Sequence, residues 1–286
     1  MTDREYALKC ESSYEKQLDK AADTICADER IKLILVAGPS CAGKTTTTKK
    51  LREKLTACGR TVYQVSLDDF YKNKEDAPIG ADGKPDLETI ESLDLEYLHE
   101  FLALLCEGRE VLAPRFDFHT KRRAPEYEKI DMEEGDLCII EGLHALNPII
   151  YERYLDRSRL YRIFLDPQDN KKYGFTKYEI RRMRRLVRDF YNRNSSAENT
   201  LTMWHSVREG ERKWIYPFES DADVTVDTCF EYEPAILKTK AEMILRTVSA
   251  HSEHWQKSKI LLDKLAVIEP LSESIVPKDS MLREFI

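Results

Sequence analysis

The sequence predicts an α/β protein built on a parallel, doubly wound sheet. Short apolar runs, typical of strands buried on both faces, recur at 31–37, 137–142 and 160–165. Longer helical stretches occur at 44–58, 93–106 and 176–194. Such alternation favours parallel strands joined by crossover helices, and ligands of these sheets bind beyond the carboxyl ends of the strands.

The first half of the chain is expected to begin with a polar helix over 4–28 and a buried strand over 31–37. The following helix, 44–58, is closed by Gly59, and a second strand covers 61–67. We expect this second strand to lie next to the first. Residues 72–87 are rich in Gly, Pro, Asp and Lys, which predicts a loop before the helix 93–106.

The second half is expected to be irregular over 114–129 and to continue with the strands 137–142 and 160–165 and the basic helix 176–194. A last strand over 224–226 precedes a helix over 233–249, and the tail after 252 is less regular. The predicted organisation is a helical extension (1–29), a kinase domain (30–250) with a lid at about 176–215, and a C-terminal extension (251–286).

Composition limits the function classes. The chain has 286 residues, 34% of them charged, and its net charge of -7 argues against general nucleic-acid binding. Its seven cysteines include no CxxC pair, which predicts neither a zinc site nor a disulfide framework and suits a reducing cytosol. No apolar run approaches the roughly 20 residues of a membrane span, and no signal peptide begins the chain. We expect a cytoplasmic protein; a homo-oligomer is left open.

The first chemical motif is a phosphate-binding loop. Residues 38–45 match Gly-x4-Gly-Lys-Thr, between a predicted strand and a predicted helix. Its backbone N–H groups and the helix dipole favour phosphate, Lys44 reaches the β- and γ-phosphates, and the Thr45 hydroxyl holds Mg²⁺. The motif predicts an ATP-type nucleotide, a P-loop NTPase fold, and phosphate contacts from Gly38, Ser40, Cys41, Ala42, Gly43, Lys44, Thr45 and Thr46.

The other motifs favour a small-molecule kinase. The segment Asn73-Lys74-Glu75-Asp76 looks like a guanine-reading motif, but it follows the loop by only about 30 residues. A kinase needs a carboxylate near both the γ-phosphate and the acceptor hydroxyl. Asp68 and Asp69 end the second predicted strand, and one of them is the candidate base.

An ordered set of segments resembles the uridine kinase and phosphoribulokinase family, in the manner of a bacterial uridine kinase-like subgroup. The resemblance extends over about 31–245, and the tail 280–286 also fits the subgroup. After the phosphate loop, the matching segments are Asp68-Asp69-Phe70-Tyr71, Pro114-Arg115-Phe116-Asp117-Phe118, Ile140-Glu141-Gly142 and the arginine-rich stretch 184–193.

This resemblance implies roles for individual residues. Asp68 would be the base for the acceptor hydroxyl, Tyr71 and Phe116 would lie around a nucleoside, and Asp86 would bind its ribose. Glu141 would support Mg²⁺. The family's base-reading histidine follows the Asp-Phe segment by a few residues; here His119 lies nearby, and Lys121 takes the matching place.

The arginine-rich helix supports the same interpretation from its residues alone. Guanidinium groups suit a triphosphate and neutralise charge during transfer. The resemblance implies that Arg185, Arg188 and Arg193 lie over the phosphates as a lid, and a solvated basic face is the alternative. Six arginines fall within 13 residues of this acidic protein: Arg181, Arg182, Arg184, Arg185, Arg188 and Arg193.

Three functions therefore stay open. The first is ATP- and Mg²⁺-dependent phosphorylation of the 5′-hydroxyl of uridine or cytidine. The second is a kinase for another alcohol, such as a sugar phosphate, another nucleoside or a pantothenate-like compound. The third is an ATP-binding regulatory or RNA-associated module without transfer activity, against which the combination of Lys44, Thr45, Asp68 and Glu141 speaks.

Overall fold

The computed structural model describes residues 2–80, 83, 86, 88–117, 120, 122–153 and 156–286. Its centre is a five-stranded, wholly parallel sheet in the order β2-β7-β1-β8-β9. The α/β class predicted from sequence is confirmed. The strands are β1 (Leu33–Ala37), β2 (Val62–Ser66), β7 (Leu137–Glu141), β8 (Leu160–Leu165) and β9 (Val224–Val226).

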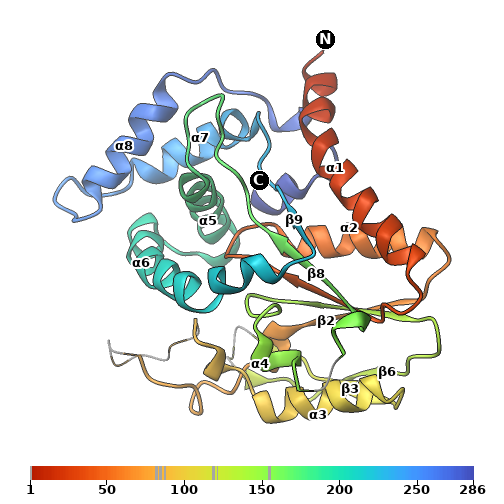
Figure 1. Ribbon diagram of the computed structural model, residues 1–286. Coiled ribbons are helices and arrows are strands. Elements are labelled where there is room, and N and C mark those ends of the chain that lie inside the picture. The colour runs from red at the N-terminus through yellow and green to blue at the C-terminus, as the bar shows by residue number, and fades with distance from the viewer. Residues whose placement is uncertain are drawn as a thin grey trace.

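Helices cover both faces of this sheet. In Figure 1, α1, α2, α5 and α7 lie on one side of the strands, and α3 and α4 lie on the other. No described helix is both long enough and apolar enough to cross a bilayer. The helices are α1 (Asp3–Ala27), α2 (Lys44–Ala57), α3 (Leu95–Cys106), α4 (Pro148–Tyr151), α5 (Lys177–Arg193), α6 (Ala197–Trp214), α7 (Glu233–Leu245) and α8 (Trp255–Ala266).

Alternation along β1 creates two apolar cores. Successive side chains of a strand point to opposite faces, so Ile34 and Val36 join the core that includes residues of α1, α5, α7 and α8. Leu33 and Leu35 join the core beneath α3. Because both faces are covered, β1 is buried throughout, and the loop that follows it starts from a rigid strand.

The expected neighbour of the second strand was wrong. β2 pairs with β7, and β7 lies between it and β1. The burial of the two strands gives the reason: β7 is buried at every position, as an inner strand must be, whereas β2 has half-buried positions typical of an edge. The carboxyl end of β7, with Glu141, therefore stands between the phosphate loop and Asp68.

Two segments are more regular than the sequence suggested. Residues 111–130 contain two short antiparallel pairs: β3 (Val111–Ala113) with β6 (Glu128–Ile130), and β4 (Phe116–Asp117) with β5 (Arg122–Arg123). The tail contains α8. The buried apolar residues of this helix are Leu261 and Leu265, four residues apart. Strands of two or three residues and so narrow a stripe produce little periodic signal.

Candidate active site

The phosphate loop connects β1 to α2, as its motif predicts. Gly38 has no room for a side chain, since an added Cβ would lie 2.4 Å from the Leu165 carbonyl oxygen on β8. Gly43 caps α2 with a left-handed φ of 84°, a conformation that favours glycine, and no side chain caps this helix. The first N–H groups of α2 are thus free of a side-chain cap and available to an anion.

The side chains of the loop already have partners. Lys44 Nζ donates to the carbonyl oxygens of Gly38 at 2.9 Å and Pro39 at 3.3 Å, so its ammonium lies folded over the loop. Thr45 is exposed, as a hydroxyl that meets a hydrated metal must be. Thr46 Oγ1 donates to a carboxylate oxygen of Glu284, 3.1 Å away.

Arginines of α5 hold the tip of the loop. Arg181 donates to the Ser40 carbonyl oxygen at 3.1 Å, and Arg185 donates to the Ser40 hydroxyl at 2.9 Å. Arg184 donates to the Cys41 carbonyl oxygen at 3.0 Å, while the Ser40 N–H donates to Glu211 at 3.1 Å. Ser40 and Cys41 therefore take their conformation from helices far away in sequence.

The arginines of α5 divide into two sets. Arg181 and Arg184 are fully buried and pair with the fully buried Glu211 and Glu233, so their guanidinium groups are engaged within the fold and are not free for phosphates. The second set, Arg185, Arg188 and Arg193, shares the single buried carboxylate of Asp189, at 3.2, 2.8 and 3.8 Å respectively. Three cations around one anion leave positive charge in excess beside the loop. These three are the residues predicted for the lid.

Two carboxylates stand at the ends of the neighbouring strands. Glu141 ends β7 and accepts a hydrogen bond of 2.8 Å from the Ser66 hydroxyl. The pKa of Glu141 is raised by burial and by the nearby charge of Asp68, and lowered in part by Lys44. Burial also raises the pKa of Asp68; Lys44, Arg193 and Arg188 oppose this, and Asp69 adds to it. These influences place Asp68 within electrostatic reach of the loop lysine and the lid arginines.

The structure distinguishes the two aspartates that sequence left as alternatives. Asp69 is committed to the fold: one oxygen accepts from the Phe116 N–H at 2.9 Å, and the other pairs with Arg115 at 3.2 Å. The Asp68 carboxylate has no hydrogen-bond or ion-pair partner among the described residues; its backbone N–H donates to the Ser66 hydroxyl. Asp68 is therefore the carboxylate available for chemistry.

On the expected acceptor side, Tyr71 and Phe116 form a pair of rings with centroids 5.8 Å apart. Asp86 is half-buried, and its carboxylate accepts from the Glu88 N–H at 3.0 Å. His119 and Lys121, predicted near the base, lie outside the described residues. Tyr71 follows Asp68 by three residues, and the charge of Asp68 acts on the Tyr71 hydroxyl. The aromatic pair therefore lies near the carboxyl end of β2.

Comparisons with known proteins place this phosphate-loop protein in a family. A sequence model of the phosphoribulokinase/uridine kinase family matches residues 33–232. The chain belongs to this family. A uridine kinase of Ligilactobacillus salivarius is 29% identical over 217 residues, covering 75% of this chain and 94% of the relative. A uridine kinase of Chloroflexus aurantiacus (strain ATCC 29366 / DSM 635 / J-10-fl) is 28% identical over 193 residues, covering 67% and 84%.

A solved structure described as a possible uridine kinase from Bacillus stearothermophilus shares the fold. Its TM-score is 0.50 at 17% identity, and the alignment covers 73% of this chain and 98% of that one. Membership of the family makes the protein a kinase with a P-loop nucleotide site.

The family kinase site fits Mg²⁺ without a dedicated protein cage. Among the described residues, no group of three or more His, Cys, Asp or Glu side chains is arranged to hold a metal. Mg²⁺ usually takes one or two protein ligands together with phosphate oxygens and water. The predicted ligands Thr45 and Glu141 offer one hydroxyl and one carboxylate, which suits this pattern.

Sequence reasoning missed two acidic residues of the site. Burial raises the pKa of Glu88, and Arg185 and Lys44 act against that shift, so Glu88 stands near the cations of the donor side. Glu88 packs against α6, where a Cβ added to Gly210 would lie 2.7 Å from its Cβ. Glu211 had a sequence signal, because it continues the buried stripe Leu201, Trp204, Val207 at helical spacing.

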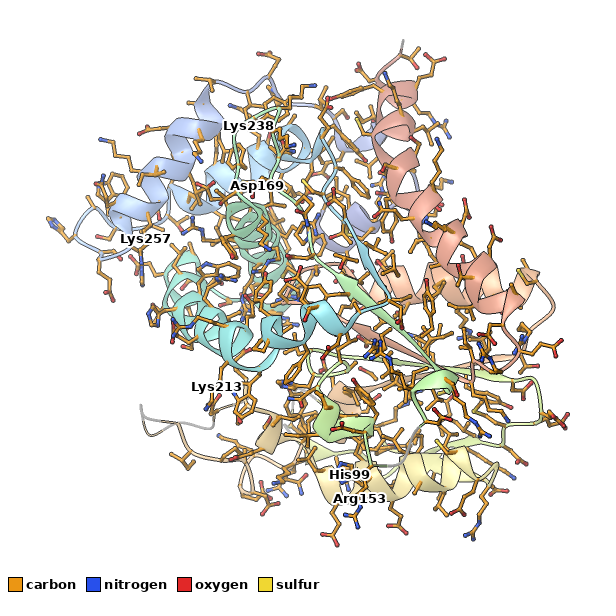
Figure 2. All side chains as sticks on the ribbon, viewed as in Figure 1. His99, Arg153, Asp169, Lys213, Lys238 and Lys257 are labelled. Atoms are coloured by element: carbon orange, nitrogen blue, oxygen red, sulfur yellow. The ribbon has the colours of Figure 1, made fainter. Side chains whose placement is uncertain are left out.

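A separate hollow, lined by Glu96, His99, Glu100, Ala103 and Arg153, lies on α3. Figure 2 labels His99 and Arg153 together at the α3 face, away from α2 and α5. The hollow on α3 therefore does not belong to the phosphate-loop site.

For Asp68 as the predicted base, its raised pKa predicts an acid limb in the pH dependence of the enzyme. A base works only when deprotonated, so kcat/KM for the acceptor should fall as the pH drops through a pKa above the usual 3.8 of aspartate. A pH profile of kcat/KM checks the expectation, and a limb at or below the ordinary pKa of aspartate would contradict it.

Proposed function

We propose that this kinase transfers the γ-phosphoryl group of ATP to the 5′-hydroxyl of a pyrimidine ribonucleoside, uridine or cytidine. The observation that carries the proposal is the available carboxylate of Asp68, within electrostatic reach of Lys44, Arg188 and Arg193. The relatives that cover most of the chain are uridine kinases, which supports a nucleoside acceptor. The protein's free cysteines support our further proposal that it works in the cytoplasm.

In the proposed reaction, Asp68 accepts the proton of the acceptor hydroxyl as its oxygen attacks the γ-phosphorus. Lys44 and the arginines Arg185 and Arg188 hold the phosphate oxygens and stabilise their developing charge. Arg193 adds positive charge on the nucleotide side. When bound at Thr45 and Glu141, Mg²⁺ supplies positive charge to the β- and γ-phosphate oxygens.

The acceptor-binding part of the proposal assigns Tyr71 and Phe116 to the base. Aromatic rings contact a nucleobase through stacking or edge contacts that contribute about 1–3 kcal/mol per base in other systems. Tyr71 is buried and Phe116 is half-buried. In this proposal the accessible part of the Phe116 ring contacts the base, and Tyr71 supports that ring from behind. Asp86 binds the ribose hydroxyls in this proposal, and recognition of the base is assigned from the sequence to His119 or Lys121.

Lys121 supports a second class of acceptor. A cation at the place of the family's base-reading histidine favours an acceptor with an anionic group, such as a sugar phosphate. This alternative keeps the same donor site and the same base.

An acceptor screen tests the proposal directly. ADP release with ATP, Mg²⁺ and each candidate alcohol should be fastest, by at least about tenfold in kcat/KM, with uridine or cytidine. Sugar phosphates, purine nucleosides and pantothenate serve as the comparison set. Turnover with a sugar phosphate and none with a pyrimidine nucleoside would transfer the assignment to the second class.

A further inference from the structure

Residues 279–285 form a compact segment beside the phosphate loop, outside the part of the chain that matches the family. The 3₁₀ turn η6 (Met281–Phe285) is capped by Ser280, whose hydroxyl accepts from the Leu282 N–H at 3.1 Å. Met281, Leu282 and Phe285 are each 1% exposed or less. Figure 1 shows this end of the chain, marked C, between α5 and α2. A segment buried to this degree is a built part of the protein.

Anchors on either side fix the position of the segment. Lys50 of α2 pairs with Asp279 at 2.9 Å, and the Ser280 hydroxyl donates to the buried Glu11 of α1 at 2.6 Å. At the other end, the guanidinium of Arg184 lies 5.2 Å from the centre of the Phe285 ring. The same arginine donates to the Cys41 carbonyl oxygen of the phosphate loop.

The segment touches the start of the phosphate-binding helix at two points. A Cβ on Gly43 would meet the Met281 side chain at 2.6 Å, so Met281 lies directly on the residue that caps α2. One turn of η6 further, a carboxylate oxygen of Glu284 accepts the hydrogen bond of the Thr46 hydroxyl at 3.1 Å. Both Thr46 and Glu284 are half-buried, so water screens this contact only in part.

The charge of Glu284 opposes the function of this helix end. The first turn of α2 follows a phosphate loop, where N–H groups and the helix dipole attract an anion. The Thr46 hydroxyl has one proton, and Glu284 already accepts it. A nucleotide phosphate at this turn would therefore meet a hydroxyl whose proton points elsewhere and a carboxylate of like charge.

We propose that Glu284 is an affinity-setting residue of the nucleotide site, which competes with the nucleotide phosphate for Thr46. The inference rests on the proposed ATP donor. Coupling between two sites is reciprocal. If Glu284 lowers the affinity for the nucleotide by some factor, a bound nucleotide therefore weakens the docking of residues 279–285 on α2 by the same factor. The tail thus limits how tightly the kinase retains nucleotide.

Calorimetric titration of ADP into the full chain with Mg²⁺ tests the proposal. Glu284→Gln keeps the shape of the side chain and an oxygen that accepts from Thr46, but removes the charge. We expect it to bind ADP about three- to tenfold more tightly than the wild type. The matched control is Glu269→Gln, which removes the same charge from an exposed tail position, and its affinity should stay within about twofold.

Hydrogen exchange of the wild type with and without ADP gives a second measurement that needs no variant. Amides of residues 280–285 should exchange faster with ADP bound, while those of the phosphate loop exchange more slowly. Equal or weaker ADP binding by Glu284→Gln, or unchanged or slower exchange in 280–285, overturns the inference and leaves the donor site intact. Absence of ADP binding by the wild type overturns the donor assignment, and this inference with it.

Discussion

Replacing Asp68 with asparagine is expected to lower kcat by about 10²- to 10³-fold. The carboxylate of Asp68 is the available base at the carboxyl end of β2, and a positioned general base contributes factors of this order. An asparagine amide has nearly the same shape but cannot accept the proton of the acceptor hydroxyl. Steady-state kinetics with the preferred acceptor would measure the loss.

The affinity for ADP separates a lost base from a damaged site. Asp68 faces the acceptor in our proposal, so Asp68→Asn should bind ADP within about threefold of the wild type. Asp69→Asn is the matched control: its amide oxygen still accepts from the Phe116 N–H, and the lost pairing with Arg115 involves a side chain that is 52% exposed. We expect that control to keep at least about a tenth of the wild-type kcat. Near-normal turnover by Asp68→Asn would remove the base assignment.

The sequence predicts the phosphate loop and its flanking strand and helix well because their signals are local. The phosphate loop is made by residues that are chain neighbours, and the glycines, lysine and threonine occur at fixed spacing. The strand before it and the helix after it were predicted within two residues of their observed bounds. Sequence alone also indicated that arginines of α5 lie near this loop.

The contact partners of the individual arginines could not be predicted from the sequence. Arg181 and Arg184 are three residues apart and point to the buried acids Glu211 and Glu233, whereas Arg185 points to Ser40 and Asp189. The division depends on which face of α5 packs into the core, and the partners lie on α6 and α7. The resemblance singled out Arg185, Arg188 and Arg193 for the lid, and only the packing shows that Arg181 and Arg184 pair instead with buried acids.

Long-range partners explain the other omissions. Ser40 is 171 residues from Glu211, and Thr46 is 238 residues from Glu284. No periodic pattern joins such pairs, since periodicity reports the local environment of an element and not the identity of its neighbour. The misplaced second strand has the same origin: β7 enters between β1 and β2 only after 70 further residues of chain, from 67 to 136.

The buried pair of Arg181 and Glu211 leads to the second large effect, on stability. Glu211→Ala is expected to lower the free energy of unfolding by about 3–5 kcal/mol, because it leaves the guanidinium of Arg181 buried without its anion. Neither side chain of this pair has any exposed surface. The change also removes the acceptor of the Ser40 N–H, so ADP binding should weaken along with stability. Urea denaturation and ADP titration measure the two effects.

Two further variants decide the physical cause. Glu209→Ala removes a glutamate from the surface of the same helix, where it pairs with an exposed Arg212, and should cost less than about 1 kcal/mol. The double variant Arg181→Met/Glu211→Leu removes both buried charges and should recover most of the lost stability, since apolar replacement of a buried ion pair is often neutral. It should not recover ADP affinity, because the Ser40 N–H and the Ser40 carbonyl oxygen still lack their partners Glu211 and Arg181. If the double variant stays as unstable as Glu211→Ala, lost packing and not an unpaired charge is the cause.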